Sequence, residues 1–139
     1  MAFAYWQRID GDRAENLNQS IDAYQQALQV YTCDAFPNDC RRASRYLGNL
    51  YFGQSNWQSA IDAYQNAFVA TENLYQACQF LDSKAAELAE IGDLSWRAAY
   101  AFARCGDLKT AVVTLERGRA RSLSESLGRD RTDLNQLQQ

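Results

Sequence analysis

The feature that most constrains the fold is a pair of adjoining helix patterns in residues 41–73, with a short turn at 53–56 between them. Within each pattern, apolar residues recur at intervals of three and four, which is the spacing of one face of a helix. Small residues alternate with large ones along these faces, as Gly48 and Tyr64 illustrate. Because a small residue lets a neighbouring helix approach closely, we expect two antiparallel helices packed against each other.

The second of these helix patterns has an earlier copy in the chain. Residues 20–28 read Ser-Ile-Asp-Ala-Tyr-Gln-Gln-Ala-Leu, and residues 60–68 read Ala-Ile-Asp-Ala-Tyr-Gln-Asn-Ala-Phe. A weaker copy of the whole pair covers residues 97–111, where Ala99 takes the place of Gly48 and a Gly-Asp turn follows. Similar units at a period of roughly 20 to 50 residues indicate a helical repeat protein.

The segments between these copies predict where the helices are interrupted. The polar stretch 10–16 predicts a long exposed loop. In the link 33–39, we expect Pro37 and the residue after it to stop helix propagation. A helical stripe continues beyond residue 73, with a break expected near residues 82–83, where Asp or Ser is a good helix N-cap. A second kink or interruption is expected at the Gly-Asp pair 92–93.

Composition narrows the class of protein. The 139 residues fit one domain, and a single proline, Pro37, leaves most of the chain free to be helical, so we expect an all-α fold. A formal net charge of −3 argues against a nucleic-acid or anionic-membrane binder. No apolar run approaches the roughly 18 residues that span a bilayer, and no signal peptide is recognisable. We therefore expect a cytoplasmic protein that contacts no membrane.

The cysteines and the absence of histidine limit the metal sites and the catalysis that the chain can support. Four cysteines occur without Cys-x-x-Cys spacing, and the chain has no His, so we expect no metal site and no cofactor. A Cys33–Cys40 disulfide across the Pro37 loop is left open, but reduced thiols are the expectation. The carboxylates at equivalent repeat positions, Asp22 and Asp62, fit a solvated helix face better than acid–base catalysis. The sequence thus predicts a protein that is not an enzyme.

The spacing in residues 41–73 resembles the tetratricopeptide repeat, a helix pair of about 34 residues. Ser44 stands where this family has Trp, and Glu72 where it often has Pro. The resemblance implies an all-α, short right-handed superhelix, an α-solenoid of stacked antiparallel helix hairpins. The matching residues, at the positions where the family places Leu, Gly, Tyr, Ala, an aromatic and Ala, are Leu47, Gly48, Tyr51, Ala60, Tyr64 and Ala67.

A second resemblance lies near the end of the chain. Residues 115–121 read Leu-Glu-Arg-Gly-Arg-Ala-Arg. This is similar to the segment that ends the repeat region in bacterial, often cyanobacterial, proteins whose tetratricopeptide repeats precede a caspase-like CHAT peptidase domain. Because the present chain has no His, it cannot form the Cys-His pair of such a peptidase. The resemblance therefore implies the repeat region alone.

The repeat register divides the single domain 1–139 into parts. Residues 1–36 form a partial first repeat with a long loop between its helices, 41–81 the second repeat, and 82–127 a longer third repeat, followed by a polar tail or helix extension at 128–139. If the first helix is cut short, Tyr24 and Leu28 are poorly covered. An exposed patch there predicts self-association.

The resemblance also implies a binding groove, lined by the first helix of each repeat. At its positions stand Asn49, whose amide suits a peptide backbone, and Arg97, which suits a carboxylate. We expect a peptide or protein segment of a partner in this groove. Two alternatives stay open: a module that docks and regulates a following CHAT-type domain, and, less favoured, nucleic-acid binding. The groove residues are Arg42, Arg45, Asn49, Phe52, Trp96, Arg97, Tyr100 and Arg104.

Overall fold

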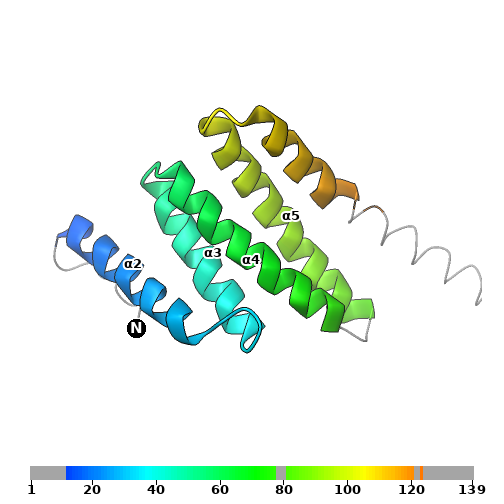
Figure 1. Ribbon diagram of the computed structural model, residues 1–139, viewed down its shortest axis with the longest axis horizontal. Helices are drawn as coiled ribbons and strands as arrows, with labels where there is room; N and C mark the ends of the chain where they lie inside the picture. The colour runs from blue at the N-terminus through cyan, green and yellow to red at the C-terminus, as the bar shows by residue number, and fades with distance from the viewer. Residues whose placement is uncertain (1–11, 78–80, 121–122, 124–139) are drawn as a thin grey trace, which may run out of the picture.

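The structure, a computed structural model, describes residues 12–77, 81–120 and 123. Within this part the chain is all-α, and none of its residues lies in a strand. Helices that follow one another in the sequence pack against each other, from α2 to α5, and a further helix follows α5 (Figure 1). Their bounds are α2 Arg13–Val30, α3 Pro37–Gly53, α4 Trp57–Ala77 and α5 Leu81–Arg104, with residues 108–120 helical after them.

Helix α2 begins inside the segment that was expected to be a loop. Asp12 is its N-cap, and the Asp12 side chain accepts a hydrogen bond of 2.9 Å from the backbone N–H of Ala14. Asn16, at the end of the predicted loop 10–16, is helical and buried. The predicted loop is therefore wrong from Arg13 onward, because a cap residue follows the glycine and starts a helix. The expected first helix of this repeat and the tail 128–139 lie outside the described residues.

Proline 37 begins a helix rather than preventing one. It is the first residue of α3, where its missing N–H is not needed and its fixed φ suits a helix. The expectation that Pro37 keeps the link 33–39 non-helical is thus wrong for its second half. The turn at 53–56 is confirmed, because α3 ends at Gly53 and α4 begins at Trp57.

Helix α5 runs without interruption from Leu81 to Arg104. The expected break near 82–83 and the expected interruption at 92–93 are both wrong, because these positions lie within α5. One glycine in a helix costs only about 1 kcal/mol relative to alanine. Burial of the neighbouring Ile91 and Leu94 side chains, which are 8% and 0% exposed, offsets that cost.

The core depends on the small and large residues that the sequence alternates. Tyr64 of α4 is completely buried, and its ring lies against Gly48 of α3. A Cβ atom added at Gly48 would stand 2.5 Å and 2.7 Å from two ring carbons of Tyr64. Two clusters of buried residues continue this packing, one joining α2, α3 and α4 and the other joining α4 to α5. The close approach predicted at Gly48 is confirmed.

The N-terminal end of the core is better covered than the sequence predicts. Tyr24 is only 8% exposed, and its ring stacks on Tyr46 with the ring centroids 5.7 Å apart. Leu28 is half-buried and packs against the same cluster. The expected exposure of Tyr24 and Leu28 is therefore wrong, because α3 supplies an aromatic partner that the repeat register did not assign to this role.

A disulfide joins the link between α2 and α3 to the first turn of α3. Cys33 and Cys40 are bonded, with Cα atoms 5.1 Å apart, whereas Cys105 is free and exposed. Reduced thiols at Cys33 and Cys40 were expected, and this expectation is wrong, since the short turn between the two helices brings the two side chains together. Asn73 of α4 donates a hydrogen bond of 3.1 Å to the Cys33 carbonyl and so holds the link against the C-terminal part of α4.

Candidate functional site

Four aromatic side chains meet where the end of α3, the start of α4 and the second half of α5 converge. We call Phe52, Trp57, Trp96 and Tyr100 the aromatic cluster. The Phe52 ring centroid lies 5.3 Å from that of Trp57, 6.5 Å from Trp96 and 5.4 Å from Tyr100. Tyr100 also contacts both Trp rings, at 5.7 Å and 6.4 Å. Most of these pairs are edge to face, an arrangement that aromatic quadrupoles favour.

This cluster is open to solvent although its rings pack together. Trp96 is 50% exposed and Tyr100 42% exposed, while Phe52 and Trp57 are half-buried. Large aromatic side chains on a surface offer much apolar area for little loss of side-chain entropy when a ligand binds. The half-buried rings hold the exposed ones in place, so the surface is prepared before any ligand arrives.

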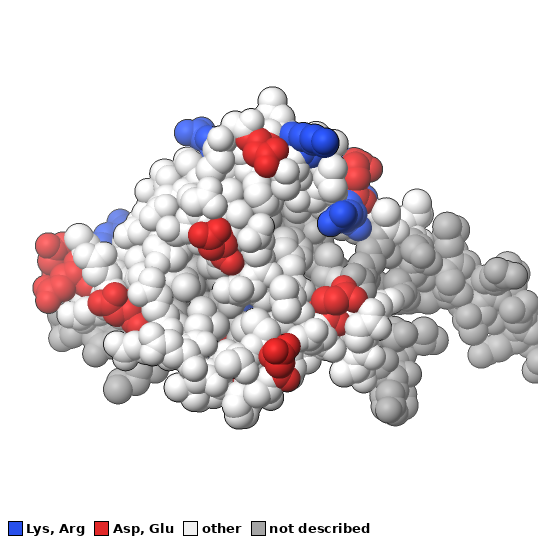
Figure 2. Space-filling model, in the orientation of Figure 1, with Lys and Arg blue, Asp and Glu red and all other residues white. Residues whose placement is uncertain are grey.

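Two arginines flank the rings. The Arg104 guanidinium carbon lies 5.2 Å from the Trp57 ring centroid, and that of Arg97 lies 5.6 Å from the Trp96 centroid. Both distances are within the range of cation–π attraction. On the face shown in Figure 2, charged side chains are scattered, with basic ones towards its upper edge and broad uncharged areas between them.

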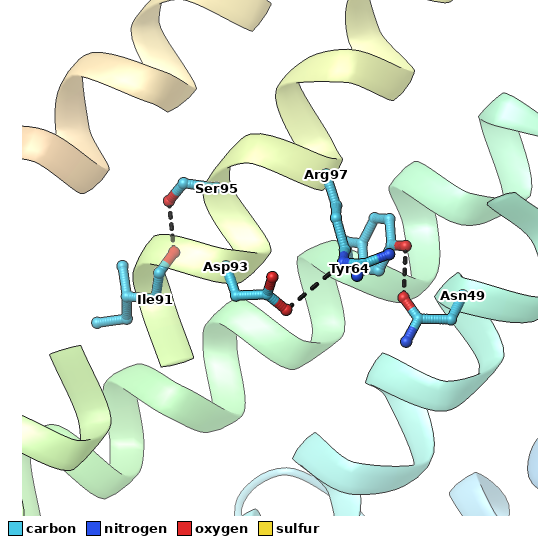
Figure 3. Close-up of polar contacts among 6 residues, drawn as sticks. All are labelled: Asn49, Tyr64, Ile91, Asp93, Ser95 and Arg97. Carbon is cyan, nitrogen blue, oxygen red and sulfur yellow. Dashed lines mark hydrogen bonds and ion pairs between the residues drawn. The ribbon is translucent and has the colours of Figure 1, made fainter. Parts of the chain in front are cut away.

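Polar side chains from α3, α4 and α5 lie close together in Figure 3. The Tyr64 hydroxyl of α4 donates a hydrogen bond of 2.8 Å to Asn49 Oδ1 of α3. On α5, Arg97 Nε lies 3.4 Å from Asp93 Oδ2, an ion pair in which Nε, although buried, lacks hydrogen-bond geometry. Asn49 is one helical turn from Phe52, and Arg97 is one turn from Tyr100.

The Tyr64 hydroxyl stays protonated at any ordinary pH. Burial raises the pKa of Tyr64 to about 12, although the charge of the Arg97 guanidinium opposes this rise. The Asp93 carboxylate adds to the increase. The hydroxyl is therefore a permanent hydrogen-bond donor in the folded protein.

The structure brings six of the eight residues predicted for the groove to one place. Arg42 and Arg45 lie seven or more residues before Phe52 on α3, or at least about 10 Å from it along the helix, and Arg45 is one turn before Asn49. Arg42 is near Tyr24 of α2, and the Arg45 guanidinium lies 6.0 Å from the Tyr46 ring. The six that gather are Asn49, Phe52, Trp96, Arg97, Tyr100 and Arg104.

Sequence reasoning missed two participants. It assigned Trp57 and Tyr64 only to packing between helices, although Trp57 contributes a ring to the cluster and Tyr64 orients Asn49. The signal for Trp57 was its place at the first helical position after the turn, where an aromatic side chain sits at the edge of the helix pair. Nothing in the sequence shows that the Tyr64 hydroxyl reaches Asn49.

A separate pocket of about 490 Å³ lies between α4, α5 and residues 108–120. Its hydroxyl groups are largely occupied, because Ser95 donates to the Ile91 carbonyl at 2.7 Å and Thr114 to the Thr110 carbonyl at 2.8 Å. The Ser95 and Thr114 hydroxyls therefore have acceptors within their own helices. Residues lining it include Phe68, Ile91 and Phe102, with Glu72, Thr110 and Arg117 among the polar ones.

Two further observations concern the described residues only. They contain no group of three or more Cys, Asp or Glu side chains arranged to hold a metal ion. None of their helices has both the length and the apolar character that a membrane crossing requires.

Comparison of the chain with known proteins identifies no relative. No family model matches it, and neither a curated protein nor a solved structure matches it either.

Proposed function

We propose that this protein is a non-enzymatic interaction scaffold of the tetratricopeptide type, which binds an extended peptide segment of a partner protein across the aromatic cluster. In this proposal α3 with α4, and α5 with residues 108–120, are antiparallel hairpins that stack into a short right-handed superhelix. The contact of Gly48 with Tyr64 supports this arrangement, because it is the small-to-large packing of such hairpins. The equivalent turns at 53–56 and 105–107 also support it.

One observation carries the binding proposal. Trp96 and Tyr100 are half exposed, yet they are held by rings from three different helices and flanked by two arginines. Binding energy at protein interfaces is concentrated in Trp, Tyr and Arg side chains. A surface that combines all three, with its side chains already positioned, is suited to recognition.

The charge of Arg104 and its distance from Arg97 indicate which peptide segment fits the aromatic cluster. Arg104 is exposed and forms no ion pair with any described residue, whereas Arg97 is paired with Asp93. From Arg97 to Arg104 is about 10 Å along α5, which an extended peptide covers with about three residues. The favoured ligand therefore places a large apolar side chain on the rings and an acidic side chain, one to three residues away, on Arg104.

Selection from a peptide library tests this proposal without a candidate partner. A phage library of random nine-residue peptides is selected on the immobilised protein, and enriched peptides are synthesised with acetylated and amidated ends. Their affinity is then measured by fluorescence polarisation. We expect an apolar residue close to Asp or Glu in the enriched peptides, and binding at least tenfold weaker to Trp96→Ala.

A matched control distinguishes binding at the aromatic cluster from non-specific hydrophobic binding elsewhere on the protein. Val69 on α4 is 52% exposed and lies outside the aromatic cluster, so Val69→Ala removes exposed apolar area without touching the site. Both variants must keep the helical circular dichroism of the wild type. Peptides that bind Trp96→Ala with the same affinity as Val69→Ala would contradict the proposal.

A second candidate function rests on a different surface. Leu108, Val112 and Leu115 occur at helical spacing on residues 108–120, and they are 65%, 58% and 39% exposed. Such a stripe suits docking of a following helix or domain, in keeping with the resemblance to repeat regions that precede a CHAT peptidase. In this role the chain is an intramolecular regulatory module, and the stripe contacts the domain that follows.

Hydrogen–deuterium exchange tests the second candidate. The exchange of residues 108–120 is measured in the 139-residue chain and in the longest protein that its reading frame encodes. Docking predicts slower exchange of this segment in the longer protein, with α3 unchanged. Equal exchange in the two proteins, or a reading frame that stops at Gln139, would rule docking out.

A further inference from the structure

We propose that the pocket between α4, α5 and residues 108–120 binds a free aromatic amino acid. Arg117 holds the carboxylate of this ligand, and Glu72 holds its ammonium group. The ring of the ligand lies beside Phe68 and Phe102. The site shares no described residue with the aromatic cluster, and its ligand is a small molecule, so this inference does not depend on the proposed function.

The pocket is a trough with α5 along its bottom. In Figure 1, α5 lies between α4 and the helix of residues 108–120. Ile91 and Ser95 of α5 are only 8% and 4% exposed. Gln65 of α4 and Arg117, which also line the pocket, are exposed at its two sides. The open side of the trough is therefore edged by side chains from the two outer helices.

Glu72 and Arg117 line the same end of this trough. Arg117 precedes Gly118, where a Cβ atom would stand 2.5 Å from Ser95 Oγ, so the last helix is closely seated on α5 at this point. Ile91 is one turn from Ser95. Glu72 lies near the end of α4 and Ile91 in the first half of α5, and only a short link joins these two helices. The two charged side chains therefore approach that end from opposite sides.

These two side chains carry opposite charges. Arg117 is exposed and forms no ion pair within the described part of the chain. Glu72 Oε1 accepts a hydrogen bond of 2.7 Å from Gln76, which steadies the carboxylate, and an ionised carboxylate can accept from several donors. A ligand with a single charge would be attracted by one side chain and repelled by the other. A zwitterion, such as an amino acid, is attracted by both.

Two phenylalanine rings favour an aromatic ligand. Phe68 and Phe102 are half-buried and pack against the cluster that joins α4 to α5, so their rings are held in place. Helical side chains lean towards the N-terminus, which brings the Phe102 ring back towards Ser95. The volume of about 490 Å³ equals about 16 water molecules at about 30 Å³ each. Phenylalanine, tyrosine and tryptophan each have fewer non-hydrogen atoms than that, so all three fit.

Titration of the 139-residue chain with free L-phenylalanine and L-tryptophan tests this inference. Nuclear magnetic resonance follows the backbone N–H signals of Thr114 and Gly118, which line the pocket. We expect these signals to shift and saturate with a dissociation constant of about 1 mM or below. L-leucine, which has no ring to pair with Phe68 and Phe102, should bind at least about threefold more weakly.

Two analogues identify which charged group of the ligand each side chain binds. Phenylpropionate lacks the ammonium group, and phenethylamine lacks the carboxylate. Arg117→Ala should weaken the binding of L-phenylalanine about fivefold to tenfold and leave that of phenethylamine unchanged. Glu72→Gln should weaken L-phenylalanine by a similar factor. It should not weaken phenylpropionate, because that analogue has no group for the Glu72 carboxylate to bind.

A neighbouring arginine gives a matched control. Arg119 is exposed, is paired with Glu116 and does not line the pocket. Arg119→Ala should therefore bind L-phenylalanine with the affinity of the wild type. Equal weakening by Arg117→Ala and Arg119→Ala would overturn the inference, and so would the absence of binding at about 10 mM ligand.

Trp96→Ala separates this inference from the proposed function. Trp96 belongs to the aromatic cluster, so its replacement should weaken peptide binding and leave amino-acid binding unchanged. If Trp96→Ala weakens the binding of L-phenylalanine while Arg117→Ala does not, the amino acid binds the aromatic cluster and the inference fails. Both variants must keep the helical circular dichroism of the wild type.

Discussion

At the scale of single residues, Tyr64 links packing to the candidate site. Its ring fills the space that Gly48 leaves, and its hydroxyl reaches Asn49. The sequence pattern predicts the first contact, because repeat spacing records residue size. It cannot predict the second, because a hydroxyl contact between neighbouring helices depends on angstrom-scale geometry. The sequence places Arg97 at a groove position that suits a carboxylate, and it did not predict the ion pair that Arg97 forms with Asp93 of its own helix.

The close approach at Gly48 gives a residue-scale prediction. Gly48→Ala places a methyl group within 2.7 Å of two Tyr64 ring carbons, so we expect a loss of about 1 to 3 kcal/mol in the free energy of unfolding. Gly53→Ala, at the exposed end of the same helix with no atom within 4 Å, should change it by less than about 1 kcal/mol. Urea denaturation measures both, and equal effects would contradict the packing described.

The Tyr64 pKa gives a second residue-scale prediction. Between pH 10 and about 12, the unfolded chain releases the Tyr64 proton while the folded chain keeps it. The contribution of the Tyr64 hydroxyl to the free energy of unfolding is fully present below pH 10 and is lost as pH rises through this window. Relative to Tyr64→Phe, the wild type should lose about 1 kcal/mol of unfolding free energy between pH 9 and pH 11. A constant difference between the two proteins would show that the hydroxyl is not buried.

At the scale of helices, the periodicity of apolar residues predicted that a helix exists better than it predicted where the helix begins and ends. The apolar spacing predicted α3 and α4 and the turn between them. The start of α2 at Arg13, the start of α3 at Pro37 and the continuity of α5 through Gly92 were missed. Each of these depends on one residue, the cap Asp12, Pro37 at the first helical position or Gly92, whose local effect of about 1 kcal/mol is small beside that of tertiary burial.

The contact between α5 and residues 108–120 gives an element-scale prediction. A Cβ atom added at Gly118 would lie 2.5 Å from Ser95 Oγ and 2.8 Å from Ser95 Cβ. Gly118→Ala should therefore destabilise the protein by about 1 to 3 kcal/mol and speed hydrogen exchange in 108–120. Gly92→Ala, in open space within α5, should instead stabilise it by about 0.5 to 1 kcal/mol.

A compensating change tests whether that contact is the cause. In the Gly118→Ala background, Ser95→Gly removes both clashing atoms. It should cost less there than in the wild type, and it should restore slow exchange of residues 108–120. If the two substitutions are simply additive, the segment is not held by the Gly118 and Ser95 contact.

At the scale of the whole molecule, the helix order brings together residues that are far apart in the sequence. Asn49 and Phe52 on α3 meet Trp96, Arg97 and Tyr100 on α5 because α4 packs between the two helices and returns the chain. The sequence predicted this gathering through repeat register. It also predicted that Arg42 and Arg45 line the same groove, and these two residues lie nearer the start of α3, beside Tyr24 and Tyr46.

The most direct test of the central claim is a nuclear magnetic resonance titration with the selected nine-residue peptide. The indole N–H signals of Trp57 and Trp96 and the side-chain amide of Asn49 serve as reporters. If the peptide lies across the aromatic cluster, these signals shift together and saturate with one dissociation constant, while signals from residues 108–120 stay in place. Shifts confined to residues 108–120, with the Trp57 and Trp96 indoles unchanged, would contradict the claim.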